Sequence, residues 1–157
     1  TPVLLREAMA PHIAAEREGR PIALAPLVAA HRALARAFDA TVVEGVGGFL
    51  VPLGPADDAR DLAVALGLPV ILVVGLRLGC LNHALLTAEA IRRADLELAG
   101  WVANTLDPHM AAPEENVAAL AERLPAPLIG RLPHAPAADP AALAAYLDVT
   151  RLAGGPR

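Results

Sequence analysis

A carboxylate followed by three glycines has the chemistry to hold a metal ion beside phosphates. The stretch VVEGVGGFLVP, residues 42–52, places Glu44 directly before Gly45, Gly47 and Gly48. Glycine lacks a Cβ atom, so such a loop can adopt positive φ angles and bring its backbone close to a ligand. Because an acid repels phosphate unless a divalent cation lies between them, we expect Glu44 to hold or orient hydrated Mg²⁺. A tight turn with a solvated acid is an equally acceptable alternative.

A second group of residues, at a predicted helix start, could bind an anion. An apolar run ends at Gly75, and a helical pattern begins near Cys80 to Asn82, just after Gly79. The first turn of a helix presents unpaired backbone N–H groups and the positive end of the helix dipole. We therefore expect this helix start to suit a carboxylate or phosphate, with Asn82 adding a side-chain donor.

Cys80 and His83 lie three residues apart on the same predicted helix, a spacing open to a nucleophile and its base. The sequence offers no third group to orient the histidine, and a lone helical cysteine is more often a small buried hydrophobe. We therefore expect Cys80 to be unreactive and His83 to be a core or capping residue. Trp101, on an apolar run, is likewise expected in the core, and the five histidines lack the spacing of a metal site.

The elements that must position these residues alternate between helices and strands. Apolar residues at spacings of three and four predict helices, and short runs of branched apolar residues predict strands covered on both faces. We expect strands at 41–45, 68–75, 98–104 and 127–133, and helices at 24–38, 57–66, 80–93, 113–124 and 140–152. Gly67 stands where the second helix should stop. This alternation predicts an α/β fold with a parallel sheet, which binds ligands beyond the carboxyl ends of its strands.

The composition limits the classes of partner. With 157 residues, 55% of them hydrophobic, and a net charge of -4, the chain is expected to form a single globular domain over 1–157 with a flexible tail at 153–157. The mild acidity gives no reason to expect nucleic acid or membrane as a partner, and the apolar stretch at 68–76 is too short to span a bilayer. A single cysteine suits a reducing compartment, so we expect a cytoplasmic protein. All 13 basic residues are arginines.

Five blocks of the sequence resemble the family of ATP-dependent dethiobiotin synthetases. The blocks occur in the same order and approximate spacing as in that family. They are PHIAAEREGRPI (11–22), VVEGVGGFLVPL (42–53), LPVILVVGLRLGCLNHALLTAEAI (68–91), LAGWVAN (98–104) and PLIGRLP (127–133). The resemblance implies a P-loop NTPase-like fold with helices on both faces of a parallel sheet, usually in a homodimer. It also implies a ligase that closes the ureido ring of dethiobiotin from the small molecules 7,8-diaminononanoate, CO₂ and ATP with Mg²⁺.

The same resemblance implies roles for individual residues. Those that match the family's nucleotide-binding positions are Glu44, Gly45, Gly47, Gly48, Asn104 and Pro133. Among them, Glu44 matches an acid that helps to hold Mg²⁺, Asn104 reads the adenine edge and Pro133 belongs to the base pocket. Those that match the family's site for the substrate carboxylate, across the dimer interface, are Leu78, Gly79, Cys80 and Asn82. In this role Cys80 supplies a backbone amide and not a reactive thiol.

The sequence departs from the family's pattern at its beginning. The family carries a glycine-rich phosphate loop that ends in Lys-Thr and a second lysine soon after, and neither is present in these residues. We therefore expect a fragment of a longer synthetase that lacks the first strand and the phosphate loop, with its catalytic residues upstream of Thr1 and little activity by itself. The alternatives are a reduced relative without ATP chemistry, a non-catalytic dimerisation or ligand-binding module, and a related P-loop amidoligase or ATPase.

Overall fold

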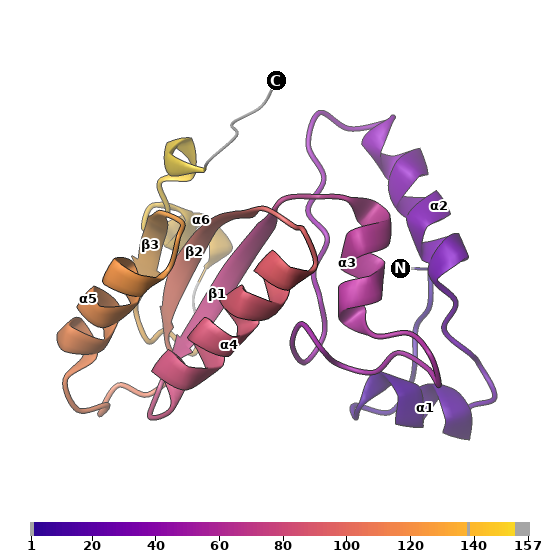
Figure 1. Ribbon diagram of the computed structural model, residues 1–157, viewed down its shortest axis with the longest axis horizontal. Helices are drawn as coiled ribbons and strands as arrows, with labels where there is room; N and C mark the ends of the chain where they lie inside the picture. Colours follow the sequence, from indigo (N-terminus) through magenta and orange to yellow (C-terminus); the bar gives the residue numbers. More distant parts are fainter. Residues whose placement is uncertain (1, 138, 153–157) are drawn as a thin grey trace. The chain divides into compact units, whose positions relative to one another are not determined.

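The computed structural model describes residues 2–137 and 139–152, which Figure 1 draws as a coloured ribbon. The chain divides into two compact units, Thr1–Leu68 and Pro69–Arg157. The prediction of one domain over the whole chain stays a prediction, and the flexible tail predicted at 153–157 lies outside the described residues. None of the described helices is both long and apolar enough to cross a membrane.

Three parallel strands form the sheet of the second unit in the order β1-β2-β3, as the α/β prediction requires. Their bounds are Val70–Leu76 for β1, Leu98–Thr105 for β2 and Leu128–Leu132 for β3. Gly75 pairs with Asn104, and Asn104 pairs with Leu132, so the three carboxyl ends meet at one edge of the sheet. Within the described residues β1 pairs with β2 alone, which leaves its other side unpaired.

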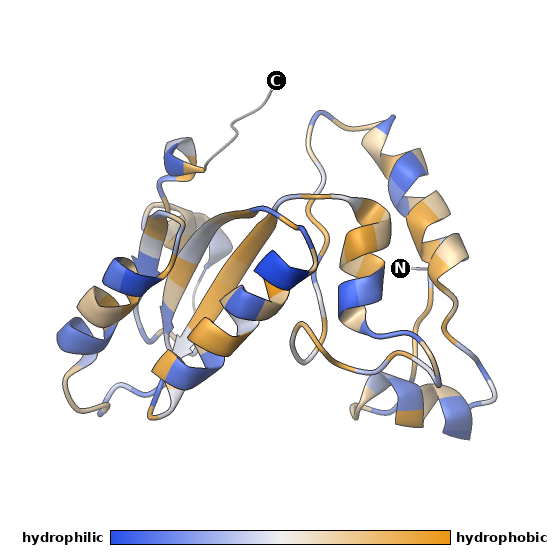
Figure 2. Cartoon of the chain, in the orientation of Figure 1, coloured by the Kyte–Doolittle hydropathy of each residue, from blue (hydrophilic) through white to orange (hydrophobic). Residues whose placement is uncertain are grey.

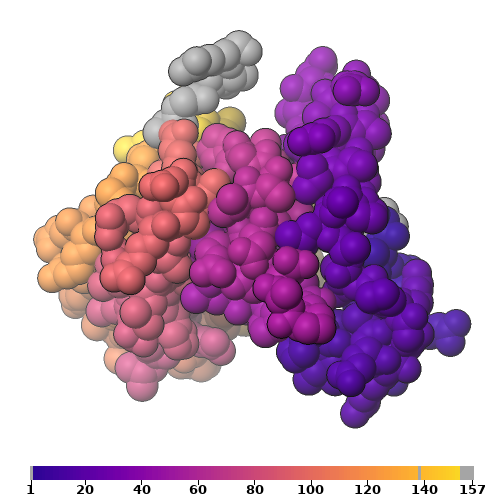
Figure 3. Space-filling view, turned by 45° about the vertical axis from the view of Figure 1, so that its right-hand side comes forward, coloured from indigo at the N-terminus to yellow at the C-terminus, as the bar shows by residue number. Residues whose placement is uncertain are grey.

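Two helices cover one face of this sheet. They are α4, Cys80–Arg93, and α5, Pro113–Arg123. Their apolar sides pack on β1 and β2 around Trp101 and Leu120, both fully buried, which confirms the prediction of a core tryptophan. Burying one such side chain stabilises the fold by roughly 1.5–3 kcal/mol. Figure 2 shows that these helices carry both polar and apolar residues, and Figure 3 draws the chain with its side chains filled in.

The short helix α6, Pro140–Ala144, lies on the opposite face (Figure 1). Arg131 of β3 reaches Glu114 of α5, so the next residue back, Gly130, faces away from α5. A Cβ atom on Gly130 would lie 2.0 Å from the carbonyl oxygen of Tyr146, so only glycine fits there. Helices on both faces agree with the predicted architecture.

Three helices form in the first unit: α1 at Pro11–Arg17, α2 at Leu24–Ala35 and α3 at Ala59–Leu66. α3 begins at a reciprocal cap, in which the Asp61 N–H donates to the Asp58 carboxylate at 3.0 Å and the Asp58 N–H donates to the Asp61 carboxylate at 2.9 Å. The helix ends at Gly67, whose φ of 64° is left-handed, as the sequence predicted.

The strand predicted at 41–45 is wrong. This segment joins no sheet among the described residues, and Val42 is 92% exposed. Valine favours a strand only where a neighbouring strand supplies hydrogen-bond partners and a packing surface. Glu44 therefore lies in an irregular segment and not at the carboxyl end of a strand.

The helix predicted at 140–152 is interrupted. After α6 the chain forms an antiparallel bridge between Leu147 and Gly130, and the Asp148 N–H donates to the Ile129 carbonyl at 2.9 Å. A single 3₁₀ turn, η1, follows at Val149–Arg151. The backbone groups between the two helical pieces are thus satisfied by β3, which removes the reason to continue the helix.

Candidate functional site

The carboxyl edge of the sheet brings together the predicted site residues of the second unit. The loop Arg77–Gly79 and the start of α4 follow β1, Asn104 lies near the end of β2, and Pro133 comes directly after β3. Because the strands are parallel and Gly75, Asn104 and Leu132 pair across their carboxyl ends, these three segments share one edge. This is where open α/β sheets bind ligands, and the binding role of each residue stays a prediction.

The start of α4 leaves backbone donors free. Gly79 precedes the helix with a φ of 94°, and no side chain caps the helix. The Cys80 N–H donates to the Arg77 carbonyl at 3.0 Å and the His83 N–H donates to the Gly79 carbonyl at 3.2 Å. Within the described residues, the N–H groups of Leu81 and Asn82 have no backbone acceptor. Two free donors at the positive end of a 14-residue helix suit an anion such as a carboxylate.

Side chains at this helix start divide between solvent and core. Leu78 is 95% exposed and Asn82 is exposed, so both are accessible to a ligand or to another subunit. Cys80 is only 2% exposed, and its thiol contacts the Asn116 side chain at 3.9 Å. The thiol therefore packs in the core, which agrees with the expectation that it is not a nucleophile. His83 is exposed and no side chain caps α4, so the structure contradicts the expectation of a core or capping residue.

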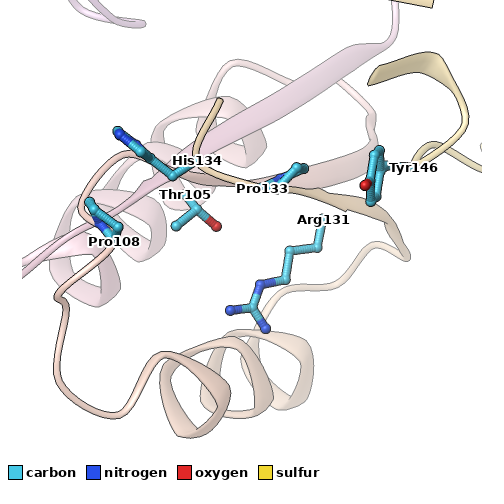
Figure 4. A pocket seen from close by; sticks show the side chains of 6 residues that line it. All are labelled: Thr105, Pro108, Arg131, Pro133, His134 and Tyr146. Carbon is cyan, nitrogen blue, oxygen red and sulfur yellow. The ribbon is translucent and has the colours of Figure 1, made fainter. Parts of the chain in front are cut away.

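A surface depression lies beyond the ends of β2 and β3 (Figure 4). Its volume is about 430 Å³, and its lining consists of Thr105, Pro108, Arg131, Pro133, His134 and Tyr146. Pro133 was predicted for a base pocket, and Thr105 follows the predicted Asn104, which does not itself line the depression. Arg131 is the one charged lining residue, and its guanidinium pairs with the Glu114 carboxylate.

Sequence reasoning missed most of this lining. Thr105 and His134 could have been found, because each stands at or just after the carboxyl end of a strand. Tyr146 carries no such signal, since it reaches the depression only through the bridge between Leu147 and Gly130.

The loop after Glu44 has the backbone conformation that its glycines suggested. Gly47 has a φ of 70° and Gly48 a φ of 130°, values that favour glycine. A Cβ atom on Gly47 would also lie 3.2 Å from the Val51 side chain. Glu44 belongs to the first unit and the start of α4 to the second, so a shared site between them stays a prediction.

The residues present are compatible with a magnesium ion held mainly by phosphates. Among residues 2–137 and 139–152, no three His, Cys, Asp or Glu side chains are grouped to hold a metal by themselves. Mg²⁺ commonly takes one or two carboxylates together with phosphate oxygens and water. Glu44 is exposed and, in the described chain, makes no hydrogen bond or ion pair, so its carboxylate can fill that role.

Comparison with known proteins identifies the family. A family model described as an AAA domain matches residues 1–142. The chain is 56% identical over 157 residues to ATP-dependent dethiobiotin synthetase BioD of Janthinobacterium sp. (strain Marseille), and 56% identical over 146 residues to that of Aromatoleum aromaticum. It is 52% identical over 151 residues to the protein of the same name from Nitrosospira multiformis. The chain belongs to the dethiobiotin synthetase family.

This membership confirms the resemblance drawn from the five sequence blocks. The matches cover 100%, 93% and 96% of this chain and 66%, 65% and 67% of the three relatives, so the chain spans about two thirds of the length of the dethiobiotin synthetases it matches. The parallel sheet of the second unit, with helices on both faces, agrees with the P-loop NTPase-like fold expected of this family.

Proposed function

We propose that the protein containing this chain is a dethiobiotin synthetase, an ATP-dependent ligase of biotin biosynthesis. It joins CO₂ to 7,8-diaminononanoate and closes the ureido ring of dethiobiotin, using ATP and Mg²⁺. The observation that carries this proposal is the edge of the sheet formed by the carboxyl ends of its strands. The uncapped start of α4 and the depression at the end of β3 both lie at this edge. Identity of 52–56% to dethiobiotin synthetases supports it.

The start of α4 binds the carboxylate of the diamine substrate. The free N–H groups of Leu81 and Asn82 donate to the carboxylate oxygens, and the helix dipole lowers the energy of the negative charge. The exposed Asn82 side chain adds a further donor, while Gly79 and Cys80 shape the backbone turn. Leu78, which is 95% exposed, offers an apolar surface beside this anion site.

The nucleotide is bound by the residues that match the family's nucleotide-binding positions. Asn104 and Pro133 contact the base, and the glycine loop Gly45, Gly47 and Gly48 brings backbone N–H groups toward the phosphates. Glu44 holds Mg²⁺, which when bound neutralises phosphate charge.

This reaction depends on the protein to position the reactants and does not require a nucleophilic side chain. One amine of the diamine adds to CO₂ as a carbamate, the γ-phosphoryl group moves to a carbamate oxygen, and the second amine displaces phosphate to close the ring. Fixing the carboxylate at one end of the substrate sets the distance of both amines from the nucleotide. The residues of this chain thus bind and orient, and the site is completed by the second subunit of a cytoplasmic homodimer.

The proposal is tested with the protein expressed in its full reading frame. Phosphate release should depend on both the diamine and CO₂, and its absence under saturating ATP and Mg²⁺ would reject the proposed reaction. Glu44→Gln keeps the shape but removes the charge, so Mg²⁺-dependent turnover should fall on the order of 100-fold.

Asn82→Ala provides the complementary variant at the other end of the site. Because a hydrogen bond to a charged group contributes roughly 1.5–3 kcal/mol, the KM for the diamine should rise about tenfold or more, with the KM for ATP unchanged. Equal increases in both constants would argue against separate substrate and nucleotide regions.

A further inference from the structure

The chain after α6 crosses β3 and is held there by a β-bridge and hydrogen bonds. Leu147 forms an antiparallel bridge with Gly130, the Asp148 N–H donates to the Ile129 carbonyl at 2.9 Å, and the Arg151 guanidinium donates to the Leu128 carbonyl at 2.9 Å. We call residues 146–148 the crossing segment. Two of these contacts come from the crossing segment and the third from Arg151, and together they reach three successive residues of β3.

Gly130 makes this approach possible. An added Cβ atom would lie 2.0 Å from the Tyr146 carbonyl oxygen and 3.1 Å from the Cα atom of Leu147. Both neighbours are backbone atoms, which cannot rotate away, so any other residue would push the crossing segment off β3. The sequence thus pairs a glycine with an aromatic residue that is 16 positions later.

The crossing segment presents the Tyr146 ring to the depression. Tyr146 lines it together with Pro133 and His134, and the residue is 53% exposed (Figure 4). The lining contains no carboxylate, and its charged member, Arg131, is already paired with Glu114. An aromatic side chain in this lining, on the same side of the depression as Pro133, suits a planar heteroaromatic ligand, because any base can stack on an aromatic side chain.

We propose that Tyr146 is a base-stacking residue of the nucleotide site, held in place by the bridge from the crossing segment to Gly130. This inference rests on the proposed function, which puts the nucleotide base beside Asn104 and Pro133. Tyr146 then contributes to ATP affinity and takes no part in binding the diamine, whose site is at the start of α4 on the other side of β2.

The test uses two substitutions at one position in the full-length enzyme. Tyr146→Leu keeps an apolar side chain but removes the ring, so the KM for ATP should rise about fivefold or more while the KM for the diamine stays the same. Tyr146→Phe keeps the ring and should restore the ATP constant. An equal rise in both constants for Tyr146→Leu, or no rise in either, would overturn the assignment.

A second measurement follows the Tyr146 ring in the unaltered protein and uses Tyr146→Phe only to assign its signals. Tyr146 is the single tyrosine of these 157 residues, and its ring proton resonances, assigned by their loss in Tyr146→Phe, should move upfield when ATP stacks on the ring. Unmoved resonances at saturating ATP would refute the inference. A shift in a protein without diamine- and CO₂-dependent phosphate release would reject the proposed function and keep the stacking role. Normal phosphate release with unmoved resonances would keep the proposed function and reject the stacking role of Tyr146.

Discussion

Replacing Gly79 by alanine tests the anion site through the backbone alone. Gly79 has φ 94° and ψ -6°, a conformation that alanine adopts at a cost of roughly 1–3 kcal/mol. Its added Cβ atom would meet only the His83 Cε1 atom, at 3.8 Å, so the cost is conformational and not a clash. The turn should relax toward negative φ and rotate the free N–H groups of Leu81 and Asn82 away from the carboxylate.

The magnitude follows from the hydrogen bonds that would be lost. Losing one bond to a charged acceptor, about 1.5–3 kcal/mol, corresponds to a rise of about tenfold or more in the KM for the diamine. Steady-state kinetics give that constant, and urea unfolding gives the loss of stability.

Gly67→Ala is the matched control. Gly67 also has a positive φ, 64°, and nothing lies within 4 Å of an added Cβ atom. Gly67 ends α3 and has no role assigned to the substrate, so Gly67→Ala should lose a similar free energy of unfolding with no change in the KM for the diamine. If Gly79→Ala also left that KM unchanged while losing stability, the start of α4 would not be the carboxylate site.

Three further predictions concern stability and reactivity. Cys80, 2% exposed, should resist alkylation by iodoacetamide in the native protein and react readily in urea, as followed by peptide mass; equal rates in both would show an accessible thiol. Hydrogen bonds from two arginines, Arg92 first, lower the pKa of Glu89 from the ordinary 4.5 to about 2. The charged form therefore stabilises α4 above pH 4.5, and this stabilisation is lost as the pH falls toward 2; a carboxyl titration by NMR with its midpoint near 4.5 would contradict this. Asp58→Ala removes the reciprocal cap with Asp61 and should lower the free energy of unfolding by about 1 kcal/mol, so an unchanged urea midpoint would count against the cap.

Elements with strong local signals could be predicted from the sequence. The helix expected at 80–93 has those bounds, Gly67 ends α3 as expected, and the last three predicted strands are β1, β2 and β3. Each depends on neighbours close in the chain: helical apolar spacing, a glycine that accepts positive φ, or a run of branched residues.

Features that depend on residues distant in the sequence could not be predicted from it. The segment 41–45 has strand composition but no pairing neighbour among the described residues. The chain at 140–152 has helical composition, yet its bonds to β3 interrupt the helix. α1, which was not predicted, begins at Pro11 without a side-chain cap, so its usual start signal is missing.

Some residues of the candidate site could likewise be predicted from the local sequence, and others could not. The helix start at Gly79 to Asn82 follows from local sequence, and its free N–H groups are a property of any uncapped helix. Tyr146 joins Thr105 and Pro133 only because three separate segments end at one edge of the sheet. No local sequence pattern predicts that these three residues lie together.

The unpaired side of β1 has a practical consequence for handling these 157 residues by themselves. Among the described residues, the main-chain donors and acceptors on this side of β1 join no sheet, so an extended peptide such as the same strand of another molecule can pair with them. Ile71 and Val73 of β1 are 44% and 59% exposed. Light scattering from concentrated solutions of these 157 residues should therefore increase with time, and Val73→Lys should slow that increase.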